Sequence, residues 1–174
     1  MYKLALTSIP FGIAVFFSGT TASQAPAPAT PAPIPDAMPF DIPYGTPISF
    51  ERAKQVGDAA MAEAKKRNWK DAIAVTGPAG DLVYFVRMDG TQYASAKIAE
   101  HKARVAATFR RPTKAFFDAF ESGHAYVSTI DDVIAADGGV PIMEGGKLIG
   151  GIGVSGGTGA QDAVVAKAGA DTVK

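Results

Sequence analysis

Several residue types are absent or scarce in this chain of 174 residues, and each absence narrows its chemistry. There is no cysteine, which excludes disulfide bonds, thiolate metal sites and a lipid-modified cysteine anchor. The two histidines are too few for a multi-histidine metal site within one subunit. Lysine and arginine number 17, as do aspartate and glutamate, so there is no basic excess to favour nucleic-acid binding.

The N-terminus has the pattern of a secretory signal peptide, predicted to span residues 1–25. Lys3 supplies a basic start, residues 4–17 form an apolar run, and small residues follow up to Ala25. The alternative, a retained membrane anchor, is disfavoured because the run falls short of the roughly 20 residues that span a bilayer. We therefore expect a periplasmic or secreted protein with no membrane span after cleavage.

Proline is concentrated in the next segment, where eight of the twelve prolines lie between residues 24 and 47. Alternating alanine and proline forms neither a sheet ladder nor a packed core, so residues 26–47 are predicted to be an extended, semi-rigid linker. The remaining residues, 48–174, are enough for one domain with its own core.

Hydrophobic periodicity and turn residues predict a mixed fold for this domain. Ser49 is placed to cap a first helix that ends near Trp69, Gly77–Gly80 suits a hairpin turn, and Pro112 should end the second helix. Hairpins with helices packed on them define an α+β domain. The predicted helices are 50–69, 94–109, 113–121 and 160–168, and the predicted strands are 71–76, 81–87, 140–143 and 147–154.

Glycine is concentrated near the C-terminus, with ten of the nineteen glycines between Gly138 and Gly159. Such density predicts tight turns and a backbone-lined wall of a cavity. The motif at 153–157 matches a nucleophile elbow, but both histidines precede Ser155, against the usual triad order. A dinucleotide-binding fingerprint is excluded because no βαβ unit surrounds the run. The loop is expected to present N–H groups to an anion, with Gln161 in the following helical turn.

Lys102 is a charged residue in the middle of an apolar helix face. Ile98, Lys102, Val105 and Phe109 are spaced i, i+4, i+7 and i+11, so they share one side of the second helix. An unpaired charge there would be costly. Two interpretations stay open: the ammonium group extends to solvent along a packed stem, or it enters a pocket to meet an anion or Asp89.

Other polar residues have both a structural and a functional interpretation. Thr113 is placed either to cap the third helix or to line a pocket beside Arg110 and Arg111, whose guanidinium groups suit carboxylates. Arg87 and Asp89 follow a strand, where they form either a surface pair or part of a binding site.

Iron ligands are few. His101 and His124 are the candidates, although a lone histidine is more often a surface or core residue with satisfied hydrogen bonds. Met88 and Met143 are weaker iron ligands and are most simply core residues.

Six blocks of the sequence together match a known family. They are 82–90, 102–103, 109–113, 138–142, 149–157 and 161–162. In this order they resemble the GlcG/HbpS-like haem-binding family, which includes the C-terminal domain of PduO-type proteins. The resemblance implies a profilin-like three-layer α/β/α sandwich with a five-stranded antiparallel sheet, and a homo-oligomer. Since the pattern shows four strands, the fifth is expected between residues 125 and 135 or as an extension of the hairpins.

The resemblance also implies an exported protein that binds haem or another small anionic ligand, with a role in haem sensing, storage or handling. An isomerase of small oxo- or hydroxy-acids with Lys102 or Asp89 as acid–base group is an alternative, as is a structural role. His101 is the predicted metal ligand. The positions that match the family's motifs are the predicted ligand-binding residues: Arg87, Asp89, Lys102, Arg110, Arg111, Thr113, Gly139, Pro141, Ser155 and Gln161.

Overall fold

The computed structural model describes residue 34 and residues 36–174, and its folded unit extends from Ala37 to Lys174. The predicted signal peptide, residues 1–25, and residues 26–33 and 35 of the predicted linker lie outside the described residues. Within the described part of the chain, no helix combines the length and the hydropathy needed to cross a membrane.

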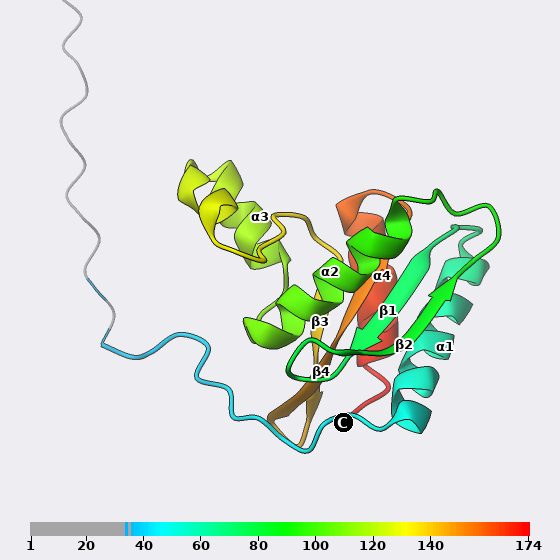
Figure 1. Ribbon diagram of the computed structural model, residues 1–174, viewed down its shortest axis with the longest axis horizontal. Helices are drawn as coiled ribbons and strands as arrows, with labels where there is room; N and C mark the ends of the chain where they lie inside the picture. The colour runs from blue at the N-terminus through cyan, green and yellow to red at the C-terminus, as the bar shows by residue number, and fades with distance from the viewer. Residues whose placement is uncertain (1–33, 35) are drawn as a thin grey trace, which may run out of the picture. The chain divides into compact units, whose positions relative to one another are not determined.

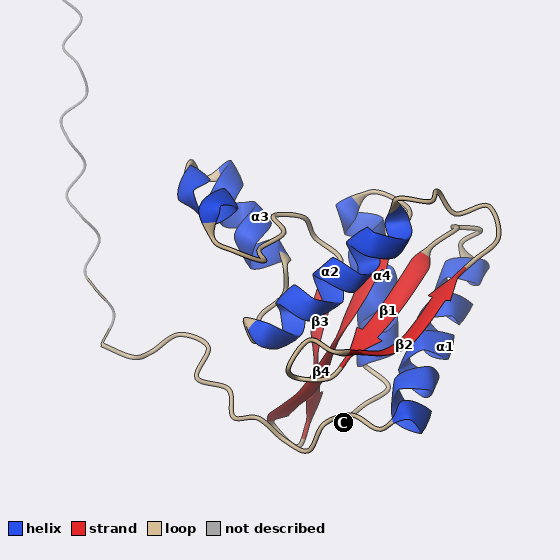
Figure 2. Ribbon diagram, viewed as in Figure 1, coloured by secondary structure: helices blue, strands red, loops and turns tan. Residues whose placement is uncertain are grey.

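Four antiparallel strands form one sheet in the order β2-β1-β4-β3 (Figure 2). The two hairpins are joined through β1 and β4, with Ala72 opposite Ser155 and Thr76 opposite Gly151. Ala72 also lies opposite Arg87, so the start of β1 is flanked by the ends of β2 and β4. The strands are β1 (Ala72–Thr76), β2 (Leu82–Arg87), β3 (Gly139–Glu144) and β4 (Lys147–Ser155).

Helices cover both faces of this sheet (Figure 1). Helix α2 (Ser95–Thr108) packs on one face, and α1 (Phe50–Lys66) and α4 (Gly159–Ala170) pack on the other. The alternation of β1 explains the two layers: Ile73 and Val75 point into the main core with α1 and α4, whereas the neighbouring alanines face α2. The predicted α+β class and three-layer arrangement are confirmed.

The five-stranded sheet implied by the resemblance is wrong for this chain. The stretch expected to hold the fifth strand contains the 3-10 helix η1 (Ala125–Thr129), which packs on α3 (Lys114–Glu121). The sheet therefore ends at β3 on one edge and at β2 on the other.

The end of the predicted linker runs beside β4 instead. Gly45 N donates to the carbonyl oxygen of Leu148, and Leu148 N donates to that of Pro43, both at 2.8 Å. Tyr44 and Leu148 form a single parallel bridge rather than a strand. These residues pair with the part of β4 that extends beyond β1, so the folded unit begins before the predicted boundary at residue 48.

The predicted helices and strands are all present, with their ends shifted by a few residues. Ser49 caps α1 as expected, since its side chain accepts a hydrogen bond from Arg52 N. The first helix stops at Lys66, before the predicted end, because Asn68 takes a left-handed conformation with φ of 57°. Arg110, with φ of 55°, turns the chain away from α2 just ahead of Pro112.

Candidate functional site

Strand β4 carries glycines where α2 approaches it most closely. A Cβ atom on Gly151 would collide with the carbonyl oxygen of Ala103, and one on Gly153 with the carbonyl oxygen of Ala99. Because these glycines have no side chains, the backbone of α2 packs directly on β4. At these positions the glycines position α2, and with it Lys102, and do not line a cavity as the sequence suggested.

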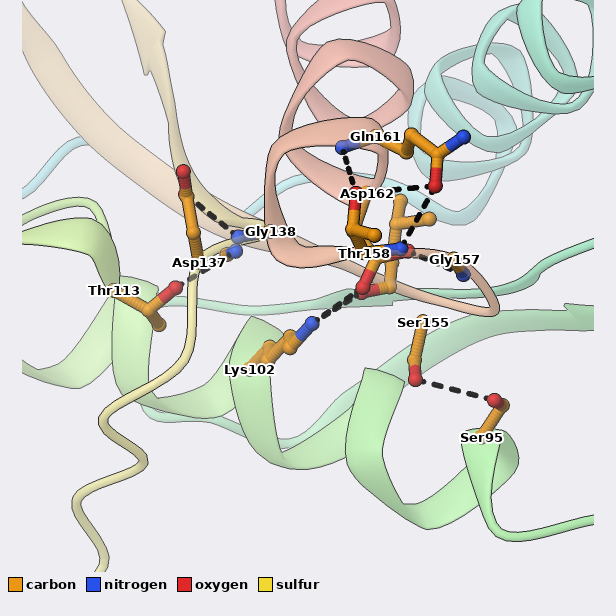
Figure 3. A network of polar contacts seen from close by, with 12 residues as sticks. Ser95, Lys102, Thr113, Asp137, Gly138, Ser155, Gly157, Thr158, Gln161 and Asp162 are labelled. Carbon is orange, nitrogen blue, oxygen red and sulfur yellow. Dashed lines mark hydrogen bonds and ion pairs between the residues drawn. The ribbon is translucent and has the colours of Figure 1, made fainter. Parts of the chain in front are cut away.

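Lys102 projects from α2 into the interior beside the end of β4 (Figure 3). Its Nζ atom donates to Asp162 Oδ2 at 2.7 Å and to the carbonyl oxygen of Val154 at 3.0 Å. Both charged side chains are 3% exposed. The interpretation that the ammonium group extends to solvent is therefore wrong. The ammonium group does meet an anionic group, but this is the carboxylate of Asp162 in the first turn of α4 and not Asp89. Removing one partner of such a buried pair is strongly destabilising.

Asp162 occupies the place of the anion expected at the glycine loop. Its Oδ1 atom accepts a hydrogen bond from Gly157 N at 2.9 Å (Figure 3). Thr158 caps α4 in a capping box with Gln161, which satisfies further N–H groups of the first turn. The loop therefore binds a carboxylate of its own chain, at the helix end where negative charge is favourable.

Asp71 is a second buried carboxyl group beside this ion pair, and sequence reasoning did not single it out as a site residue. Its Oδ2 atom is buried with no hydrogen-bond partner among the described residues. Burial, and then the charge of Asp162, raise the pKa of Asp71 to about 6, while Lys102 opposes the shift. Its position gave no signal in the sequence, since Asp81 stands in the same place before β2 and is exposed.

Thr113, in the segment between α2 and α3, is hydrogen-bonded to the first residue of β3. Its Oγ1 atom accepts a hydrogen bond from Gly139 N at 2.9 Å, and its own N–H donates to the carbonyl oxygen of Gly139 at 3.0 Å. The side chain is fully buried and makes no cap on α3, so the capping interpretation was wrong. The bond fixes Pro112 and Pro141 near each other on the surface above it.

Arg110 and Arg111 contact the segment that leads into the domain and do not join Lys102. Arg110 Nη1 donates to the carbonyl oxygen of Ile42 at 2.9 Å, and its guanidinium group lies 5.4 Å from the ring centre of Tyr44. The guanidinium group of Arg111 lies 3.7 Å from the ring centre of Phe40. These contacts give both arginines a structural role in holding residues 40–44.

An apolar hollow of about 490 Å³, here called the apolar groove, lies between β3, α4 and the start of α3. Lys114 and Lys167 stand at its rim, each paired with the aspartate four residues further on. Of the predicted site residues, Pro141 lines it. Its apolar lining is formed by Pro112, Val140, Pro141, Met143, Ala163, Ala170 and Val173.

A second region, here called the polar basin, consists of two adjoining hollows of about 410 and 380 Å³ that share Asn68, Trp69 and Lys70. The predicted site residues that line it are Arg87, Asp89 and Gln161. Because Gln161 lines the basin and Ala163 lines the groove, the intervening Asp162 and its partner Lys102 lie between the two regions.

The remaining predicted residues are packed inside or lie elsewhere. Gly139 and Ser155 are buried, and Ser155 Oγ donates to Ser95 Oγ at 3.2 Å (Figure 3). His101 Nε2 lies 3.0 Å from the carbonyl oxygen of Asp132, and His101 lines neither the apolar groove nor the polar basin. In the part of the chain that the structure describes, no group of three metal-ligating side chains surrounds it or any other point. Iron binding by His101 stays a prediction.

The chain thus forms a small α/β/α domain with an antiparallel sheet. A buried lysine–aspartate pair lies between its apolar groove and its polar basin. The chain belongs to the family described as haem degrading protein HbpS-like, whose model matches residues 48–171. This confirms the family that the six sequence blocks indicated.

Similarity to individual proteins supports the same assignment. Protein GlcG of Escherichia coli K12 is 42% identical over 108 residues, which cover 62% of this chain and 81% of that protein. A double mutant of Streptomyces reticuli HbpS has a similar structure, with a TM-score of 0.70 and 26% identity over 84% of this chain and 99% of that one. The PduOC haem complex shares the fold at a TM-score of 0.67 and 24% identity, covering 74% and 96% of the two chains.

Proposed function

We propose that the protein binds haem, or a planar ligand of similar shape and charge, in the apolar groove. Membership of a family described as haem-degrading supports a haem-handling role. The observation that carries the proposal is the combination of an apolar floor on β3 and α4 with two lysines at the rim. Its volume of about 490 Å³ falls within the range of small-molecule sites, about 300–1,000 Å³.

The rim lysines suit the two propionate groups of haem. Lys114 Nζ lies 2.6 Å from Asp118 Oδ1, and Lys167 Nζ lies 2.6 Å from Asp171 Oδ2. All four side chains are more than half exposed, so these pairs contribute little and can be exchanged for a bound carboxylate. The apolar floor would then receive the porphyrin ring, whose burial supplies most of the affinity.

Met143 is the residue of the groove lining whose side chain can ligate haem iron. Sequence reasoning treated it as a core residue, but the structure leaves it half-buried at the groove. His101, the predicted ligand, does not line this region. The residues present therefore fit haem held mainly by its apolar face and its carboxylates, and the Met143 thioether would be available to its iron.

A haemin titration tests this proposal. We expect a saturable shift of the Soret band with the wild-type protein, and roughly tenfold weaker binding when Lys114→Ala and Lys167→Ala are combined, since charge-assisted hydrogen bonds are lost. Met143→Ala should change the Soret position. Lys54→Ala is the matched control, because Lys54 forms the same i,i+4 pair with Asp58 on α1, outside the groove. An unshifted spectrum, or equal affinity in the double variant, would contradict the proposal.

The same proposal includes export, a homo-oligomeric state and a periplasmic or secreted location. Residues 1–25 carry the sequence pattern that supports export. Fractionation of cells that express the whole chain, followed by N-terminal sequencing, tests it. A mature N-terminus near Ala25 outside the cytoplasm is expected, and a cytoplasmic protein that retains Met1 would contradict it. Light scattering of the mature protein tests the assembly.

A further inference from the structure

Three loops surround the polar basin at one end of the sheet. The start of β1 lies between the ends of β2 and β4, since Ala72 is opposite both Arg87 and Ser155. The loop before β1, the turn after β2 and the loop after β4 therefore meet there, and each contributes to the lining. Loops that a rigid sheet holds together in this way are common places for ligand binding.

Cationic groups predominate in the basin. Lys65 and Lys70 are exposed and form no ion pair within the described part of the chain. The neighbouring Arg67, by contrast, pairs with Glu63. Asp89 is the one carboxylate that lines the two hollows as the structure describes them. An ammonium group without a partner at a hollow is available to an incoming anion.

Neutral hydrogen-bond donors line the second hollow of the basin, together with Lys70. Gln161 Oε1 accepts hydrogen bonds from Thr158 N and Thr158 Oγ1, which leaves the NH₂ group of its amide as a donor. Gln92 is exposed and lines the same hollow. Trp69 adds an aromatic surface shared by both hollows. This mixture of ammonium and amide donors suits oxygen atoms that carry negative charge.

Two glycines let the loops that form the basin pack closely on one another. A Cβ atom on Gly156 would collide with the Asp71 carboxyl group, so the backbone must be bare at this point of the wall. Gly90, with φ of 78°, lies against Lys70, and a Cβ there would come within 3.1 Å of the lysine Nζ. The hollow therefore depends on the close contacts of these loops and is not a gap left by chance between long side chains.

We propose that the polar basin is a second binding site, for a small oxyanion such as a carboxylate or a phosphate. Lys70, which lines both hollows, and Lys65, which lines the first, supply the charge. The amides of Gln92 and Gln161, which line the second hollow, orient the oxygen atoms. The site differs from the apolar groove in position and in chemistry, so it does not depend on haem binding. The glycine loop contributes backbone to its wall, while its N–H at Gly157 remains bound to Asp162.

The single tryptophan of the chain, Trp69, lies in the basin and reports on its occupancy. The full-length protein is titrated with sodium phosphate and, separately, with sodium malonate, while chloride holds the ionic strength constant. We expect a saturable change of tryptophan emission. Combining Lys65→Gln with Lys70→Gln should weaken it roughly tenfold, because charge-assisted hydrogen bonds are lost. Lys70→Arg should retain binding.

Lys54→Gln is the control, since it removes a cation from α1 at a place outside the basin. Its titration should match that of the wild type. Saturation by either anion supports the proposal, and the tighter of the two identifies the ligand class. A response that chloride alone reproduces, or a double variant that titrates like the wild type, overturns it. Haemin is absent throughout, so the result is independent of the groove.

Discussion

The apolar groove and the polar basin lie on either side of one buried ion pair, yet they are built differently. The groove has a carbon-rich floor on a strand and a helix, and its two lysines at the rim already have carboxylate partners. The basin is formed by loops, and the ammonium groups of Lys65 and Lys70 have no such partners among the described residues. The groove therefore suits a largely apolar ligand with charged groups at its edge, whereas the basin suits a small charged ligand.

Both regions depend on the same support. Asp162 lies between a basin residue and a groove residue on α4, and Lys102 holds it from the opposite layer. A Cβ atom on Gly138 would approach both Lys102 Nζ and Asp162 Cβ, so the turn into β3 also packs on the pair. A change at the Lys102–Asp162 pair should therefore alter both the apolar groove and the polar basin. A change on the groove side or on the basin side should alter that region alone.

Replacing Lys102 by methionine should have the largest effect. The substitution keeps an apolar stem but leaves Asp162 charged and buried without its cation, which costs about 3–5 kcal/mol of the free energy of unfolding. Urea denaturation followed by circular dichroism measures it. Lys54→Met, which breaks an exposed pair, should change the midpoint little. Equal, small losses in the two variants would show that the buried pair is not the support.

Asp71→Asn tests the basin side through its pH dependence. The pKa of Asp71 is raised in the folded state to about 6 from an ordinary value of 3.8, so the folded protein loses stability as pH rises from about 4 to about 6. The asparagine variant lacks this loss. Its stability relative to the wild type should grow by about 2 kcal/mol between pH 4 and pH 7. Removing the charge beneath Gly156 should also tighten phosphate binding in the basin.

Denaturation curves at several pH values measure this difference. Asp118→Asn is the control, since Asp118 lies in an exposed pair at the groove side. If the free energies of unfolding of the Asp71 variant and the wild type change in parallel between about pH 4 and pH 7, the carboxyl group of Asp71 is not desolvated. That outcome would contradict the structure.

The elements of the fold were predictable because their signals are local. The side chain of Ser49 caps the helix that it precedes, and the glycines of 77–80 stand in the turn that they form. The pairing of Pro43 and Gly45 with Leu148 was not predictable, since its partners are about a hundred residues apart and leave no periodic pattern. The linker's end was therefore excluded from the domain.

The candidate site was predictable in part for the same reason. Lys102 stood out because a charge interrupts an apolar face, but nothing local indicates that Asp162 is its partner. Glycines that allow close helix packing, as at Gly153, have the same appearance in sequence as glycines that line a cavity. Thr113 looked like a helix cap because its bond to Gly139 crosses between elements.

Thr113→Val should have the smallest effect on stability, and it should affect the groove without affecting the basin. Valine has nearly the same shape but leaves Gly139 N without its buried acceptor, which should cost about 1–3 kcal/mol of the free energy of unfolding. Thr113→Ser keeps the hydroxyl and should lose less. Because the bond fixes Pro112 and Pro141, haemin binding should weaken in the valine variant while phosphate binding stays unchanged. A parallel loss of both would mean that the two hollows respond as one site.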